Sequence, residues 1–518
     1  MKKLIKKICA LSLAASLIFG FSVSVSAYSE VPETIRIGLY YGSSAKATCA
    51  VTSTGAIAIS IANESEEWPI CEDDGIGSVN VKRDEAYHLK INESFSDYES
   101  AAQKKESLSA EGYPAFVAYS DGEFAVWVGV YASKIEAENN MGGLDAGVLS
   151  PNANSVLVYA GDAVWMAVSD RASYLTLSPV GGNLAVEGTA YRGKVQFMRR
   201  DTGDMTVVNV VDFDDYLCGV VPREVSASWN YEVVKAQAVV SRTFAIQNLN
   251  KYKKYGFNLD NTTNSQAYAG IKIEHPASNR AVEETHGEVV LYNGKPADVY
   301  FFASSGGKTG TANDAWGGEN KPYLMSVDDP YENPKEASYA NWTMTFTPEE
   351  IKAKLAAKDI NIGDITDVKV EYSDSGRVIC TTFIGTKGEK EYLRENIRWI
   401  LGVYSTAFTV SRSGQQVSGE VCVLDGYNTF NKISLSPDVK LLSAGGTGSL
   451  AASNLVIVAS GATKVIESQN VGTGDFVFTG RGWGHGVGMS QWGAKGMADN
   501  GFTYDEIIEY YYQGTEVG

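Results

Sequence analysis

Cysteine and histidine are scarce in this chain, which has six cysteines and four histidines among its 518 residues. Five cysteines follow the first 27 residues. They are odd in number and lack CxxC spacing, so the sequence indicates neither a disulfide framework nor a zinc ribbon. Cys218 and Cys422 lie in apolar runs, where a thiol usually behaves as a small buried side chain. Cys49 and Cys71 could form a disulfide, a pairing that the sequence leaves open.

Positive charge is also in deficit, and the formal net charge at pH 7 is -18. Proteins that bind nucleic acid neutralise its phosphates with lysine and arginine, so we expect no nucleic-acid partner. The acidity favours solubility outside the cell and says little about fold. No repeat of about 20–50 residues is present, and the length supports two or more domains with their own cores.

Long hydrophobic runs are absent after the N-terminus. Residues 1–27 are typical of a secretory signal peptide, with four early lysines, an apolar stretch over 8–21 and a small-residue cleavage site ending at Ala27. We therefore expect a secreted or cell-wall-associated protein, cleaved after Ala27. The alternative is an uncleaved membrane anchor, because the apolar stretch is close to the short limit for a span.

The rest of the chain predicts a mixed, strand-rich α+β protein. Alternating apolar residues and frequent turn residues predict a strand-rich segment over 28–80 and further short strands from 155 onward. A helical period predicts one prominent helix over 231–249 and shorter helices over 348–357 and 504–512.

Residues 84–148 form a unit of their own in the sequence. Their pattern predicts the order β-α-β-β-α, with helices after Ser96 and from Ser133 to Leu144. This order resembles the SPOR domain, which implies binding to peptide-free glycan. The alternative is a small α+β domain with no assigned role.

Glu224 is the carboxyl most suited to catalysis. It follows a proline-stiffened turn within Val220–Val225, just before the prominent helix. Apolar neighbours would raise its pKa, as a general acid at neutral pH requires. The alternative is a glutamate that merely favours the helix dipole.

The prominent helix has two faces. One, containing Val233, Ala236 and Val240, should face the core. The other contains Lys235 and Arg242, which could lie against a substrate or form a solvated face with an ion pair to Asp214 or Asp215.

Three further segments offer groups for a polar ligand. Glycines alternate through Gly480–Gly488 and let the backbone approach other groups closely, so that nearby side chains can line a wall. The turn at Ser304 and Ser305 lacks the phosphate-loop pattern, and its hydroxyls could contact sugar oxygens. Trp316 and Tyr323 could stack on sugars or belong to the core. The wall residues are His485, Ser490 and Gln491, together with Trp483 and Trp492. A Ser-His-Asp triad through His485, the only histidine in such a motif, is a weaker alternative.

Four ordered segments resemble the stage II sporulation protein D (SpoIID) family of bacterial cell-wall proteins. They are Val220–Val225, Ala236–Ala245, Phe302–Thr309 and Gly480–Ala494. The likeness covers roughly residues 190–330 and 475–518, within a region of 155–518 that we expect to act on peptidoglycan.

The resemblance implies a lytic transglycosylase that cuts peptide-free glycan strands. Glu224 would act first as acid and then as base, leaving 1,6-anhydro ends, and Arg242 would bind substrate. The alternative is a non-catalytic, glycan-binding enhancer of a cell-wall amidase, which would then be a partner. A structural wall or spore-coat protein is a third class.

One departure from the family pattern concerns metal. Some members carry His and Cys where this chain has Asn264 and Ser265, which are poor zinc ligands. We therefore expect no zinc and no other cofactor, with packing holding this loop instead.

Overall fold

The computed structural model describes residues 28, 31–63, 65–71, 75–199, 203–413 and 474–518, and between 414 and 473 the backbone of six short strands. The predicted signal peptide and the Cys422 side chain lie outside the described residues. In the described parts of the chain, no helix has the length and apolar character needed to cross a membrane.

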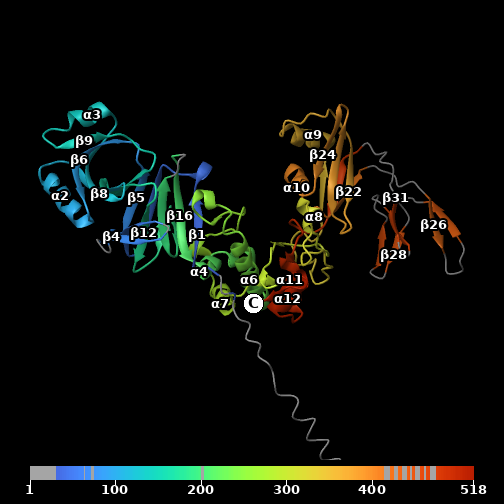
Figure 1. Ribbon diagram of the computed structural model, residues 1–518. Coiled ribbons are helices and arrows are strands. Elements are labelled where there is room, and N and C mark those ends of the chain that lie inside the picture. Colours follow the sequence, from blue (N-terminus) through green and yellow to red (C-terminus); the bar gives the residue numbers. More distant parts are fainter. Residues whose placement is uncertain are drawn as a thin grey trace, which may run out of the picture.

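Two large sheets form the N-terminal half of the molecule, drawn in blue to green in Figure 1. The first has the order β17 (Leu259–Asp260), β1 (Thr34–Tyr40), β16 (Met205–Asp212), β15 (Lys194–Arg199), β12 (Tyr174–Val180), β3 (Ala56–Ala62) and β4 (Glu67–Cys71). The second has the order β14 (Thr189–Tyr191), β13 (Leu184–Val186), β2 (Thr48–Ser53), β5 (Ser78–Arg83), β10 (Ser155–Ala160), β11 (Ala163–Ser169), β7 (Ala115–Ser120), β8 (Glu123–Tyr131), β6 (Tyr87–Phe95) and β9 (Ala146–Leu149).

The segment 28–80 does not form a layer separate from the rest. Its strand β1 pairs with β16, and β3 pairs with β12, both antiparallel. Side chains of both sheets, such as Ile37 and Val81, belong to one buried cluster. Strands distant in sequence therefore build this half together, and a boundary near residue 80 does not divide the sheets.

The predicted β-α-β-β-α order of 84–148 is confirmed by β6, α2 (Tyr98–Ala110), β7, β8 and α3 (Lys134–Asn139), after which β9 adds a strand. The helix α3 is shorter than predicted, ending at Asn139. One face of this unit has its own core, but the other packs Trp127 against Leu157 and Ala167. Because β7 also pairs with β11, the unit continues into the larger sheet.

Helices packed around α6 form the middle of the molecule (Figure 1). The predicted helix at 231–249 is confirmed as α6 (Tyr231–Gln247), whose first turn is capped by Asn230. Its neighbours are α4 (Phe213–Cys218), α5 (Val221–Glu224), α7 (Pro276–Glu284), α11 (Gln491–Asp499) and α12 (Tyr504–Tyr511). Since these surround α6, Ala238 is buried as completely as Val233, and the predicted open face does not exist along most of the helix.

A second, separate core lies in the part drawn in orange in Figure 1. Its elements are β21 (Trp342–Phe346), α9 (Pro348–Ala356), β22 (Ile365–Tyr372), β23 (Val378–Gly385), β24 (Gly388–Leu393), α10 (Asn396–Leu401), β25 (Phe408–Arg412) and β32 (Phe476–Gly480). Short elements pack beside these parts, and they are β18 (Val290–Tyr292), β19 (Lys295–Pro296), β20 (Phe301–Phe302), α8 (Ala312–Trp316), β33 (Met489–Ser490) and β34 (Glu516–Val517). Among them, β18, β19 and β34 form a small sheet against α6 and α12, and α8 contacts β23.

The four described cysteines, Cys49, Cys71, Cys218 and Cys380, are all buried. No disulfide joins Cys49 to Cys71, the pairing that the sequence left open. Cys218 lies in the main core, as its apolar surroundings predicted.

Truncating Trp127 tests whether the second face of the 84–148 unit is part of the common core. Its side chain is 1% exposed. We expect Trp127→Ala to lower the free energy of unfolding by about 3–5 kcal/mol, through lost burial and the cavity left behind. The exposed Ile135 of the same unit provides the control, and Ile135→Ala should cost about 0.5 kcal/mol or less. Urea unfolding followed by circular dichroism measures both, and equal losses would contradict the packing.

Candidate active site

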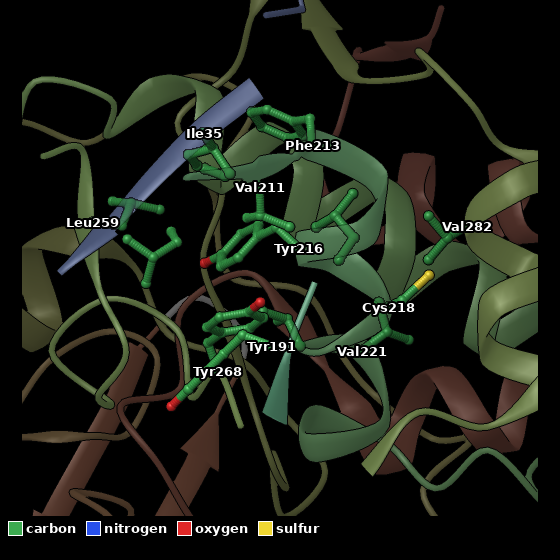
Figure 2. Packing of buried hydrophobic residues seen from close by; sticks show 14 of the residues in the cluster. Ile35, Tyr191, Val211, Phe213, Tyr216, Cys218, Val221, Leu259, Tyr268 and Val282 are labelled. Atoms are coloured by element: carbon green, nitrogen blue, oxygen red, sulfur yellow. The ribbon is translucent and has the colours of Figure 1, made fainter. Parts of the chain in front are cut away.

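Glu224 is the last residue of the short helix α5, and buried apolar residues hold this helix in place. Pro222 stands in its first turn, and Val221 is fully buried. Figure 2 shows Val221 in the same core as Tyr216, Tyr268 and Cys218. This apolar anchor holds the turn, so the position of the Glu224 carboxyl follows from the packing beneath it.

The Glu224 carboxyl is largely withdrawn from water. Burial raises its pKa, against the lowering effects of the Ala267 backbone N–H, a hydrogen bond with the Gln491 side chain and the charge of Arg223. The net shift is upward. A carboxyl in this state holds its proton at higher pH than an exposed one, as a general acid must.

A chain of buried amides and hydroxyls supports these partners. Gln491 donates through Nε2 to Gln237 Oε1 at 3.3 Å, and Gln237 Nε2 donates to Ser241 Oγ at 3.0 Å. Gln266 Nε2 donates to the Ser241 carbonyl, and Tyr216 donates to Gln266 Oε1 at 3.0 Å. Sequence reasoning missed Gln237 and Gln266. The one signal in the sequence was for Gln237, a polar residue that lies beside the apolar face of the predicted helix.

The loop that carries Ala267 is held by hydrogen bonds to Asp260. Thr262 Oγ1 and the Tyr41 hydroxyl donate to Asp260 Oδ2, at 2.7 and 3.0 Å, and the Asp260 N–H donates to Ser265 Oγ. Asn264 accepts a hydrogen bond from Lys251 through its carbonyl. Across the described residues, no group of three His, Cys, Asp or Glu side chains is placed to hold a metal ion.

Arg242 does not line a substrate face. Its side chain is fully buried, forms an ion pair with Asp214 at 3.0 Å, and donates to the carbonyls of Glu288 and Val282. The ion pair with Asp214 was one of the two alternatives, and it joins a fully buried arginine to a carboxylate that stays partly exposed. Lys235 pairs with Glu232 at 2.8 Å and lies over the ring of Tyr504.

Ser304, Ser305 and Ser490 point inward and share Glu332 as a partner. Ser304 Oγ donates to Glu332 Oε1 at 2.5 Å, while the Ser305 N–H and the Ser490 hydroxyl donate to Oε2. All three serines are buried, so the expectation that the hydroxyls of Ser304 and Ser305 contact sugar is wrong for this structure, and Ser490 does not line an open wall. They fix the turn and the start of α11 instead.

Glycines let the 480–490 loop pass close to its neighbours, as predicted. A Cβ on Gly486 would overlap the Arg377 guanidinium, and one on Gly488 would overlap the Tyr300 carbonyl. Both glycines have positive φ, at 85° and 76°. The loop can therefore pack directly on these groups.

His485 lies within this loop as a neutral ring. Its Nδ1 accepts from the Val487 N–H at 3.1 Å, and the Phe301 backbone is its other hydrogen-bond partner. Burial and two nearby arginines lower its pKa to about 3. A ring held by backbone groups does not serve as base for Ser304, whose hydroxyl is bound to Glu332, so the geometry gives no triad.

Trp316 and Tyr323 separate into different roles. Trp316 packs 5.1 Å from the His485 ring, centre to centre, and remains 47% exposed. Tyr323 is buried against Tyr292 and accepts from the Asp298 N–H, so it belongs to the core.

Asp329 is a second buried carboxyl, and sequence reasoning missed it. Burial, with a smaller contribution from the charge of Glu332, raises its pKa to about 6. The hydroxyls of Ser305, Tyr511 and Ser490 lie close enough to lower this pKa, but none reaches good hydrogen-bond geometry with either oxygen. The ionised form is therefore poorly compensated.

Replacing Asp329 with asparagine should stabilise the protein at neutral pH. Because the folded pKa lies above the unfolded value, the native state holds this proton more tightly, and ionisation destabilises it as pH rises past about 6. We expect Asp329→Asn to gain at most about 3 kcal/mol near pH 7.5, with the gain shrinking toward about pH 4.5. Asp328→Asn, at an exposed neighbour, should show no such trend in urea unfolding. A pH-independent difference at Asp329 would contradict the assignment.

Comparison with known proteins places these motifs in a family. Residues 201–292, which include Glu224 and Arg242, match the stage II sporulation protein (SpoIID) family. The amidase enhancer of Bacillus subtilis is 30% identical over 316 residues, 58% of this chain but only 40% of that protein. The stage II sporulation protein D of Bacillus subtilis is 29% identical over 331 residues, 61% of this chain and 77% of that protein. That of Bacillus amyloliquefaciens is 26% identical over 366 residues, covering 68% and 87%. Over these parts of its length, the chain is similar to the SpoIID and amidase-enhancer proteins.

Proposed function

We propose that this chain is a secreted lytic transglycosylase of the bacterial cell wall, acting on glycan strands stripped of their peptides. The family and the names of its relatives support a cell-wall function linked to sporulation. The observation that carries the enzymatic proposal is the environment of Glu224: a largely buried carboxyl of raised pKa, oriented by Ala267 and Gln491. The SPOR-like unit over 84–148 would add a second contact with the same strands.

One carboxyl suffices for this reaction. Protonated Glu224 gives its proton to the glycosidic oxygen as the bond from that oxygen to C1 breaks. The C6 hydroxyl of the same sugar then forms a bond to C1, and its proton returns to the Glu224 carboxylate. The product is a 1,6-anhydro end, and no water is consumed.

Two neighbours of Glu224 support its proposed role. The Ala267 N–H and the Gln491 amide hold the ionised form after the first proton transfer, while burial favours the protonated form before it. The two influences oppose each other, so the carboxyl can change state during the reaction. Gln491 is itself oriented by Gln237, which places it for this role.

A second candidate function is that of a non-catalytic glycan-binding protein that enhances a cell-wall amidase. The similarity to the amidase enhancer favours it. In that case the Glu224 region would form a binding groove, and the amidase would be the partner.

Replacing Glu224 with glutamine separates these functions. The change keeps size and most hydrogen bonds but removes the transferable proton, so release of 1,6-anhydro ends from stripped glycan should fall by about 10²–10⁴-fold or more. Binding to the strands should persist. Glu349→Gln makes the same change at an exposed site on α9 and should leave the rate unaltered. Mass spectrometry of the released fragments gives both rates.

Two outcomes would sink the enzymatic proposal. One is equal cleavage by wild type and Glu224→Gln. The other is no cleavage by wild type, with stimulation of a purified amidase, which would establish the enhancer function instead.

Gln491 should tune the pH dependence of cleavage. Its hydrogen bond lowers the pKa of Glu224, so Gln491→Ala should raise that pKa. Because the first step needs protonated Glu224, activity falls as pH rises through this pKa. The variant's alkaline limb should therefore shift to higher pH, even where its maximal rate is lower. A loss of rate with an unmoved limb would show that Gln491 only supports the fold.

A further inference from the structure

A cavity of about 430 Å³ lies beside the His485 loop, between α8 and α10. Its lining includes Trp316, Trp399, Arg394, Arg398, Glu395 and His485. Only Trp316 and His485 were expected in a site from sequence. The proposed reaction at Glu224 does not use the other four.

Two tryptophans border the cavity with much of their surface open to solvent. Trp399 is 76% exposed and Trp316 is 47% exposed. Exposed apolar side chains that gather around one cavity are typical of ligand-binding grooves. Their faces offer flat apolar surfaces of the kind that stack against the C–H face of a sugar ring.

Arg394 presents a guanidinium group to this cavity. Its Nε donates to the Asn313 carbonyl at 2.6 Å and its plane lies against Gly317, while its terminal nitrogens have no hydrogen-bond partner among the described residues. The backbone of Arg394 has φ of 53°, an uncommon value for a residue with a Cβ. Strained residues of this kind concentrate at ligand sites. A guanidinium with free terminal nitrogens suits a bidentate carboxylate.

The charge around the cavity favours an anion. Glu395 is its one acidic lining residue, and its Oε2 accepts from Arg398 Nη1 at 2.5 Å, so its charge is compensated. Arg377 lies buried behind the same loop, against Gly486. Both Arg398 and Arg377 lower the pKa of His485, which indicates a positive potential there. Of the two described cations that line the cavity, Arg394 is the one without an acidic partner, in a protein of net charge -18.

We propose that this cavity is a subsite for a carboxylate-bearing sugar of the glycan strand, with Arg394 binding the carboxylate and Trp316 and Trp399 holding the ring. The proposal rests on the function proposed above. Removing the peptide from a wall strand exposes the carboxylate to which it was joined as an amide, so this subsite would select stripped strands. An amide at that position carries no charge for Arg394 and brings a bulky chain.

The loop itself connects this subsite to Glu224. His485 lines the cavity, and Gln491, six residues later, lies near enough to Glu224 to lower the pKa of its carboxyl. Six residues of chain span at most about 20 Å. One glycan strand is long enough to occupy both places.

Chemical reduction of the sugar carboxylates tests the subsite directly. The probe is stripped glycan, either untreated or with its carboxylates reduced to alcohols, and binding is measured on the full mature chain carrying Glu224→Gln. We expect reduction to weaken binding about tenfold or more, as for loss of a hydrogen bond to a charged group. Arg394→Gln should bind both probes with the same lower affinity. Trp399→Ala should weaken both while preserving the preference.

Two control substitutions change the same residue types at positions far from the cavity in the sequence. Trp68→Ala removes a half-exposed tryptophan from β4, and Arg280→Gln removes an exposed arginine from α7; both should bind like the parent. Arg394→Lys keeps the charge without the fork, and it should retain part of the preference. Circular dichroism checks that each variant is folded.

The decisive quantity is the ratio of affinities for the two probes. If a folded Arg394→Gln or Arg394→Lys variant kept the parent's full ratio of affinities, the subsite would be overturned. The same holds if the parent bound untreated and reduced glycan equally well. Wild-type cleavage without any preference overturns the subsite alone. A preference lost in Arg394→Gln, without wild-type cleavage, supports the subsite while the transglycosylase function fails.

Discussion

The approach of the Gln491 amide to the Glu224 carboxyl, which lowers the pKa of that carboxyl, is the interaction on which the site depends. It joins α5 to the start of α11, two segments separated by more than half of the chain's length. Gln237 on α6 holds the same amide, and the rings of Trp229 and Trp492 meet 4.6 Å apart beside it. Without this junction, Glu224 would sit in an open turn, with neither the desolvation nor the donors that make it a usable acid.

Buried charged side chains pack near this junction, and burial of such groups does not by itself stabilise a fold. Glu332 accepts hydrogen bonds from three buried serines. Asp329 lies near it, and neither of its carboxylate oxygens has a hydrogen-bond partner. Arg377 is buried with two nitrogens that lack partners. Buried charges of this kind rarely improve stability over apolar packing. Their concentration around the 480–490 loop therefore indicates that the position of this loop, rather than the stability of the fold, is what these residues secure.

The described residues place two kinds of chemistry along one loop. At its C-terminal end, Gln491 serves a carboxyl of raised pKa. Toward its middle, His485 adjoins a cavity with tryptophans and an arginine. Neutral His485 adds no charge of its own and acts as a flat wall. Under the two proposals made here, a strand bound along this loop contacts the Arg394 side chain and the Glu224 carboxyl together.

The sequence by itself determined the local features. The extents of α6, α9 and α12, the strands of the 84–148 unit, the glycine loop and the position of Glu224 at a stiffened turn all follow from short-range periodicity and turn chemistry. Only the tertiary structure decided which faces are covered. Arg242 and the serines turned inward because α7, Glu332 and α11 close over them, and segment 28–80 paired with strands more than a hundred residues away. Gln237, Asp329 and Arg394 were missed for the same reason: burial and pairing depend on contacts distant in sequence, which a local pattern does not record.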